Sequence, residues 1–96
     1  MTAYAIMDVE IHDIARFMEY MQRVRPLLDR AGARYLARGG DFKIFEGDYQ
    51  PGRLLLLEFP SMEAIERFCN SEDYQELRSE RDRCSVTCLI AVSGTD

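Results

Sequence analysis

The sequence predicts an α+β domain of the ferredoxin-like kind, in which strands and helices follow in the order βαββαβ. Segments with the two-residue period of a strand alternate with segments of helical period along the 96 residues. The most apolar segment, 53–59, carries apolar side chains on both of its faces, as a central strand does. We therefore expect one domain over residues 1–96, with an antiparallel sheet and its helices on one face.

The first strand and the first helix are predicted over the first third of the chain. Residues 3–11 alternate in the manner of a strand, with alanine, methionine, valine and isoleucine on one side. Asp13 suits the N-cap of a helix with an apolar stripe, and Gly32 suits its end. Pro26 lies inside this pattern and predicts a kink near Arg25, because the stripe resumes in phase after it.

The middle of the chain predicts extended structure interrupted by glycines. Residues 33–38 form the second strand, Gly39 and Gly40 follow, and 42–46 is a further extended piece. Residues 33–46 are either one bulged strand or two short strands. A turn-rich loop over 47–52 then leads into the strand 53–59.

The last third predicts a broken helix and a final strand. Ser61 caps a first helical piece, and Ser71 caps a second that runs towards Asp82. A last strand spans roughly residues 85–92. In the ferredoxin-like arrangement the first and third strands lie at the centre of the sheet.

The apolar character of both faces of the strand 53–59 predicts self-association. Leu54 and Leu56 lie on one face, and Leu55, Leu57 and Phe59 lie on the other. Two helices cover only one face, and leaving leucine-sized side chains in water on the other forgoes roughly 1.5–3 kcal/mol each. We therefore expect a homodimer packed sheet to sheet.

Charge and composition exclude several classes of partner. The net charge of -5 repels phosphate backbones and anionic lipid, so neither nucleic acid nor a membrane is expected to bind. No apolar run approaches the ~20 residues that span a bilayer, and no secretory signal is recognisable. Cys69, Cys84 and Cys88 have no disulfide-like spacing, which predicts reduced thiols and a cytoplasmic protein.

Four motifs resemble those of the domain of unknown function 1330 family, a member of the dimeric α/β-barrel superfamily. They are Tyr-Leu-Ala-Arg-Gly-Gly at 35–40, Phe-Glu-Gly-Asp at 45–48, Leu-Glu-Phe-Pro-Ser at 57–61, and Ser-Glu-Asp-Tyr-Gln-Glu-Leu at 71–77 followed by Arg81. The resemblance implies a ferredoxin-like protomer whose sheet faces that of a second copy, forming a dimeric α/β barrel. It implies no activity.

Three residues are candidates for catalysis. Arg38 ends the predicted second strand beside two glycines, where it can hold a carboxylate or an enolate by a bidentate contact. An ion pair with Glu46 or Glu58 is the structural alternative. Glu46 is a candidate general base, and so is His12, the only histidine, in the turn after the first strand.

Further candidates lie on the helices. Tyr20 and Tyr74 are candidates, with Arg38 and Arg81, to line a ligand pocket, although phenols packed in the core are the alternative. Arg81 follows Tyr74 by seven residues, so both lie on one helical face and could reach the same ligand or the same surface acid. Glu58 is expected to be buried and paired with Arg38 or Arg53.

These residues leave three functions open. The first is a cofactor-free enzyme acting on a small, partly apolar molecule that is anionic or enolisable, with Arg38 stabilising negative charge and Glu46 or His12 moving a proton. The second is a module that binds or senses such a small-molecule ligand, and the third is a purely structural homodimer. No metal is expected, because the cysteines have no histidine partner at zinc-like spacing.

Overall fold

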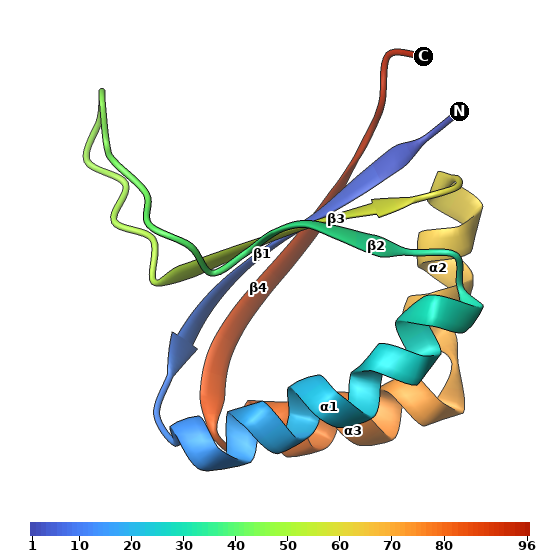
Figure 1. The fold of residues 1–96 in the computed structure, drawn as a ribbon, viewed down its shortest axis with the longest axis horizontal. Helices are drawn as coiled ribbons and strands as arrows, with labels where there is room; N and C mark the ends of the chain where they lie inside the picture. The colour runs from blue at the N-terminus through green and yellow to red at the C-terminus, as the bar shows by residue number, and fades with distance from the viewer.

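The computed structural model describes residues 1–96 as one four-stranded sheet with three helices (Figure 1). The elements are β1 (Ala3–Ile11), α1 (Ile14–Arg30), β2 (Arg34–Arg38), β3 (Arg53–Phe59), α2 (Met62–Asn70), α3 (Glu72–Asp82) and β4 (Ser85–Ser93). The strands lie in the order β2-β3-β1-β4, and all neighbours are antiparallel. This arrangement confirms the predicted ferredoxin-like fold, with β1 and β3 at the centre.

The helix ends follow the capping residues that the sequence predicts. Asp13 and Ser61 each accept a hydrogen bond from a backbone N–H in the first turn of α1 and α2. Ser71 ends α2 and begins α3, because its hydroxyl donates to a carbonyl of α2 and accepts from an N–H of α3. Helix α1 continues through Pro26, and Gly32 follows its end at φ 76°, a conformation that favours glycine.

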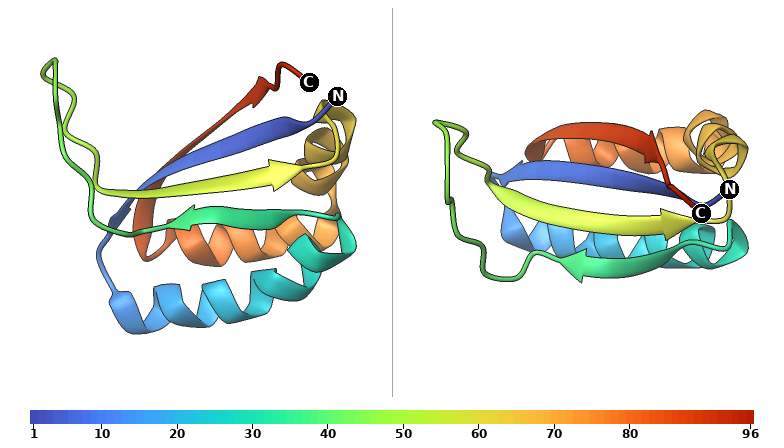
Figure 2. Two further views of the ribbon diagram at one scale, coloured as in Figure 1. Left: turned by 45° about the horizontal axis from the view of Figure 1, so that its top comes forward. Right: turned by 90° about the horizontal axis from the view of Figure 1, so that it is seen from above.

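The three helices cover one face of the sheet, and the core lies between these two layers (Figures 1 and 2). The side chains of β1 and β3 that point towards the helices are buried. They are Ala3, Ala5, Met7 and Val9 of β1, with Leu55, Leu57 and Phe59 of β3. Helix α1 contributes Phe17, Tyr20, Val24 and Leu28, so Tyr20 lies inside the buried stripe of this helix.

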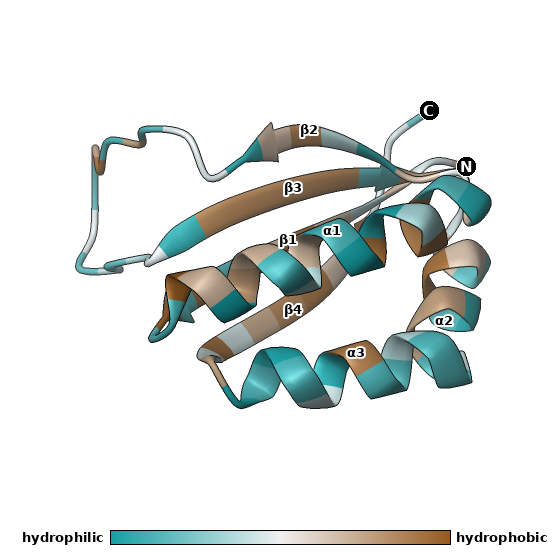
Figure 3. Cartoon of the chain, turned by 60° about the horizontal axis from the view of Figure 1, so that its bottom comes forward, coloured by the Kyte–Doolittle hydropathy of each residue, from teal (hydrophilic) through white to brown (hydrophobic).

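The other face of the sheet has no covering layer, and we call it the open face. Figure 3 shows the apolar character of β3, which is continuous along most of the strand. Leu54 and Leu56 are only half-buried on this face, and the side chains of Val86, Ile90 and Val92 on β4 are 57%, 63% and 50% exposed. The predicted two-sided apolar character of the central strands is therefore present.

Both predictions for residues 33–46, one bulged strand over the whole segment or two short strands, were wrong. Only β2 is a strand, it ends at Arg38, and residues 42–46 are unpaired. The register between β2 and β3 shifts between Tyr35 and Ala37, so the bulge lies at Leu36 rather than at the glycines. Gly39, at φ 72°, turns the chain out of the sheet.

Residues 39–52 form an excursion that we call the arm. It leaves the end of the sheet on the side away from the helices (Figure 2). Asp8 of β1 holds its returning end, accepting hydrogen bonds from the Gly52 N–H at 2.8 Å and from the Tyr49 hydroxyl. Phe45, near the tip, is 87% exposed, and Phe42 and Ile44 are each 42% exposed.

Candidate functional site

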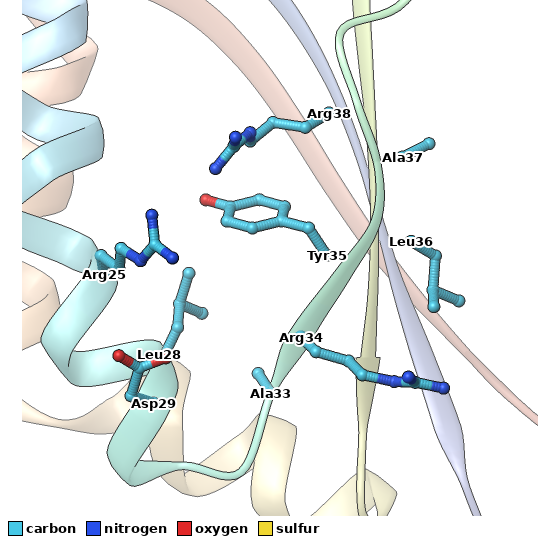
Figure 4. Close-up of a pocket in the computed structure, with 9 residues that line it drawn as sticks. All are labelled: Arg25, Leu28, Asp29, Ala33, Arg34, Tyr35, Leu36, Ala37 and Arg38. Atoms are coloured by element: carbon cyan, nitrogen blue, oxygen red, sulfur yellow. The ribbon is translucent and has the colours of Figure 1, made fainter.

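The bulge in β2 decides which way Arg38 points. Tyr35 pairs with Leu57 and Arg38 with Leu55, and both partners face the helices. A regular strand alternates its side chains, which places residues 35 and 38 on opposite faces. The extra residue, Leu36, brings Arg38 round to the helix side beside Tyr35, as Figure 4 shows.

Arg38 lies at a cleft of about 360 Å³ between α1 and the strands β2 and β3, which we call the arginine cleft. Three arginines and a glutamine supply its polar lining, and five side chains supply its apolar lining. The lining residues are Phe17, Met18, Met21, Gln22 and Arg25 of α1, Tyr35 and Arg38 of β2, and Arg53 and Leu55 of β3.

The charges in this cleft are of one sign. Arg25, Arg38 and Arg53 line it together, and no aspartate, glutamate or histidine does. The ion pairs of the chain involve other arginines, so none of these three has an acidic partner within 4.0 Å. Three guanidinium groups that share a cleft repel one another, and a bound anion relieves that repulsion.

Gly39 makes room for one of these arginines. A Cβ atom at this position would lie 2.6 Å from Cδ and 2.8 Å from Cγ of Arg53, so the stem of Arg53 occupies the space above the glycine. The Gly39 N–H donates to the Leu54 carbonyl at 2.8 Å, which fixes the glycine against β3. The absence of a side chain at Gly39 therefore positions Arg53 at the cleft.

Tyr35 stands in the wall of the cleft and contacts groups from both sides. The guanidinium carbon of Arg38 lies 5.1 Å from the centroid of its ring, a cation–π arrangement. Its hydroxyl donates a weak hydrogen bond to Sδ of Met21 at 3.9 Å. Burial raises the pKa of Tyr35, and nearby Arg38 and Arg25 partly oppose that rise, so the phenol is neutral at pH 7.

A second depression of about 390 Å³ runs along the outer edge of β2 (Figure 4). It shares Arg25, Tyr35 and Arg38 with the arginine cleft. Its remaining lining includes Asp29 and also Arg34, which is paired with Glu58. Because its charges are mixed and it wraps round an edge strand, the arginine cleft is the better anion site.

A small internal cavity of about 30 Å³ lies behind the arginine cleft. Its lining contains only apolar and aromatic residues, and Phe17, Met21, Tyr35 and Leu55 line both the cavity and the cleft. Tyr20 and Tyr74 also line the cavity. Phe17, Met21, Tyr35 and Leu55 therefore form a wall that the cleft and the cavity share.

The structure places three of the predicted ligand-binding residues together, away from the cleft. Tyr20, Tyr74 and Arg81 are 4%, 3% and 3% exposed. Arg81 donates to the Tyr74 hydroxyl at 2.8 Å and lies 5.7 Å from the centroid of the Tyr20 ring. Burial raises the pKa of Tyr20, with neighbouring Tyr74 adding to the rise. The seven-residue spacing of Tyr74 and Arg81 therefore brings these two side chains into contact with each other.

The predicted acids and bases lie elsewhere. His12 is in the turn after β1, where Nε2 is 3.3 Å from an oxygen of Glu10, and Glu46 is an exposed residue of the arm. Neither lines the arginine cleft. Glu58 is paired with Arg34, its cross-strand neighbour, at 2.8 Å, so both predicted partners, Arg38 and Arg53, were wrong. The bulge is the reason for Arg38, because it turns that side chain to the opposite face of the sheet.

Sequence reasoning missed Arg25, Arg53, Tyr35 and Gln22. The sequence does carry a signal for Gln22 and Arg25 of α1, because residues 18, 21, 22 and 25 form a stripe at helical spacing beside the buried stripe of that helix. No comparable signal marks Arg53, because its place depends on the space above Gly39.

Neither a metal-binding cluster nor a membrane-spanning helix is found in the chain. No group of three histidine, cysteine, aspartate or glutamate residues is arranged to hold a metal ion. None of the helices has the length and apolar character needed to cross a membrane.

Solved structures share this fold over nearly the whole chain. RPA0582, a protein of unknown function from Rhodopseudomonas palustris, has a TM-score of 0.78 at 16% identity, covering 99% of this chain and 83% of its own. A dimeric ferredoxin-like protein of unknown function from Jannaschia sp. CCS1 has a TM-score of 0.72 at 14% identity, covering 98% and 100%. SnoaB, a cofactor-independent oxygenase from Streptomyces nogalater, has a TM-score of 0.71 at 10% identity, covering 99% and 94%.

Comparison by sequence gives a family. None of the curated proteins compared matches the chain. The model of the domain of unknown function DUF1330 matches residues 2–95, nearly the full length, and agrees with the motifs noted in the sequence. The chain therefore belongs to the DUF1330 family.

Proposed function

We propose that the protein is a homodimer that binds a small, partly apolar anion in the arginine cleft. The observation that carries the proposal is the grouping of Arg25, Arg38 and Arg53 in one cleft with no acidic partner. The chain has 17 acidic and 12 basic residues, so acids are the commoner charged group and pairing would be easy to arrange. A cleft left cationic in an acidic chain suits an anionic ligand.

The apolar lining of the cleft supports a ligand that is partly apolar. Phe17, Met18, Met21 and Leu55 line the cleft together with the arginines, and Met18 is 48% exposed. A fully charged ligand such as inorganic phosphate would leave the accessible parts of Met18 and Met21 in contact with water. A carboxylate or enolate attached to a hydrocarbon group would cover them while meeting the arginines.

The cleft has no general base in its lining, which favours binding over acid–base catalysis. A general base must lie within hydrogen-bond reach of the proton it removes. His12 and Glu46, the two candidate bases, do not line the cleft, and Tyr35 is a neutral phenol. The arrangement can hold and stabilise negative charge, but no side chain there is suited to accept a proton at neutral pH.

The test is a binding titration with benzoate as probe, followed by NMR chemical-shift changes. Arg38→Ala removes a charge-assisted contact worth about 1.5–3 kcal/mol, which lowers affinity roughly 10- to 100-fold. Arg83→Ala is the matched control, because Arg83 is exposed, has no acidic partner and lines neither cleft. Equal affinities of the two variants would contradict the proposal.

The homodimer rests on the open face. Val86, Ile90 and Val92 are each at least 50% exposed there, and a second sheet would cover them. Each contributes roughly 1 kcal/mol when the remaining half of its surface is buried. The arm leaves the sheet on the same side (Figure 2), and its residues Phe42 and Phe45 are 42% and 87% exposed. The dimeric relative from Jannaschia sp. CCS1 supports this assembly.

A cofactor-free enzyme is the second candidate, because SnoaB, described as a cofactor-independent oxygenase, shares the fold. Arginines that hold a carboxylate also stabilise an enolate, so the same cleft would favour loss of a proton from an enolisable ligand to water. The test is exchange of the acidic C–H of a 1,3-dicarbonyl compound with deuterium oxide. Enzymatic exchange that Arg38→Ala abolishes would favour this candidate over binding alone.

The location and the remaining partners are proposals as well. The net charge of -5 supports a protein that binds neither nucleic acid nor membrane. The three free cysteines support a cytoplasmic location.

A further inference from the structure

We infer that the internal cavity behind the arginine cleft receives the apolar end of the ligand, which makes the ligand a short-chain monocarboxylate. The inference rests on the proposed function, since the acid end of such a molecule would lie at Arg25, Arg38 and Arg53. It adds a second subsite, a passage between the two subsites, and a dependence of affinity on chain length.

The cavity has the size and character of an alkyl site. Its volume of about 30 Å³ exceeds the roughly 10–15 Å³ that one water molecule needs, so about one or two carbon-sized groups fit. All of its lining residues are apolar or aromatic, and no buried side-chain nitrogen or oxygen in the chain is without a partner. Water would find few hydrogen-bond partners there, whereas a methyl or ethyl group would meet only hydrocarbon and ring faces.

The wall between cleft and cavity is suited to opening. Met21 and Tyr35 belong to both linings, and the hydroxyl–sulfur contact of 3.9 Å between them is among the weakest kinds of hydrogen bond. Methionine is unbranched and changes rotamer easily, so Met21 can move without disturbing α1. Phe17 and Leu55, the other shared residues, are each at most 2% exposed and form the fixed sides of the passage.

The positions of charge and cavity set the orientation of the ligand. Arg38 and Arg53 lie on the strands and line the cleft but not the cavity, whereas Tyr20 and Tyr74 line the cavity but not the cleft. A monocarboxylate that places its acid at the arginines directs its chain towards the Met21–Tyr35 wall. A dicarboxylate or a sugar acid would instead bring a polar group to a lining that offers it no partner.

The experiment is an NMR titration of the full chain with acetate, butyrate, hexanoate and octanoate. Each added methylene that reaches apolar surface raises affinity about three- to fourfold, until the cavity is full. Amide signals of Val24 and Ile65, which line the cavity but not the cleft, should shift with the longer acids and not with acetate.

Two variants fill the cavity from opposite walls. Ala5→Val adds volume from β1 and Cys69→Leu adds it from α2, and neither residue lines the cleft. Each is expected to lower hexanoate affinity about tenfold while leaving acetate affinity unchanged. Arg38→Ala is the contrasting variant, and it should weaken every acid by the same factor.

The outcomes separate the two proposals. If acetate and hexanoate bind equally at the arginine cleft, or if neither filling variant affects hexanoate selectively, the cavity inference is overturned and the anion site stands. If no acid shifts the signals of the cleft, the proposed function fails with it. Thermal denaturation of both filling variants shows that each is folded before its affinities are compared.

Discussion

Gly39 connects the stability of the sheet to the position of Arg53, and replacing it with alanine tests both roles. Its φ of 72° lies in the left-handed region, where an alanine costs about 1–2 kcal/mol. The new Cβ would also lie 2.6 Å from Cδ of Arg53, so the arginine stem must be displaced from its present rotamer. An off-rotamer side chain adds about 0.5–1.5 kcal/mol.

The expected loss for Gly39→Ala is therefore about 2 kcal/mol in the free energy of unfolding. For a chain of this length such a loss lowers Tm by roughly 8–16 °C. Gly40→Ala is the matched control, because Gly40 has no positive φ and a Cβ there would meet nothing within 4 Å. This control should be neutral or should stabilise by up to about 1 kcal/mol.

The assay is urea unfolding of both variants at one protein concentration, since dissociation of a dimer makes apparent stability depend on concentration. A double-mutant cycle with Arg53→Ala separates the two terms. In that background only the backbone cost remains, so the difference between the two measurements of Gly39→Ala, about 0.5–1.5 kcal/mol, is the coupling to Arg53.

Two results would refute this reasoning. If Gly39→Ala and Gly40→Ala are equally stable, the argument from φ is wrong. If Gly39→Ala is unstable but shows no coupling to Arg53, the glycine does not position the arginine. Benzoate affinity gives an independent check, because displacing Arg53 should weaken binding less than Arg53→Ala does.

Three further outcomes are expected. Ile90→Glu should give monomers in sedimentation velocity at micromolar concentration, because it places a charge on the open face. The thiol of Cys88, exposed on the protomer, should react faster with a thiol reagent in Ile90→Glu than in the wild type. A wild-type protein that sediments as a monomer and whose Cys88 reacts as fast as that of the variant would contradict the dimer. Burial raises the pKa of Tyr20 above the ordinary value of a tyrosine, so folding stability should be complete below about pH 10 and fall as the pH rises further. Tyr20→Phe should make that alkaline fall shallower in urea titrations, and an unchanged slope would show that Tyr20 does not cause it. Asp8→Asn weakens the acceptor for Tyr49 and Gly52, so limited proteolysis should cut within 39–52 several-fold faster, whereas Asp41→Asn should leave the rate unchanged.

Most of the fold could be predicted because each element carries its own local signal. The caps at Asp13, Ser61 and Ser71 act within one turn of their helices, and the structure confirms all three. The apolar character of both faces of 53–59 likewise places that segment at the centre of the sheet. The segment 33–46 was different, because its extended pattern does not say whether a neighbouring strand pairs with it.

Of the residues that line the arginine cleft, Arg38 alone was a candidate site residue from the sequence. Arg38 was found from its place beside two glycines, and it does line the arginine cleft. Arg25 and Arg53 come from a helix and from another strand, and tertiary packing alone brings them to Arg38. Tyr74 and Arg81 share a helical face as predicted, but burial turns that pair into a contact within the core.

The bulge at Leu36 shows most directly why a prediction from strand alternation misplaces the side chain of Arg38. Strict alternation from Tyr35, which faces the helices, would put Arg38 on the open face, the face that carries Glu58. The extra residue instead brings Arg38 to the helix side of the sheet, where it has no acidic partner, while Glu58 is paired with its cross-strand neighbour Arg34. A single inserted residue thus converts a structural arginine into an unpaired cation at a cleft, and it is this unpaired charge that an anionic ligand would neutralise.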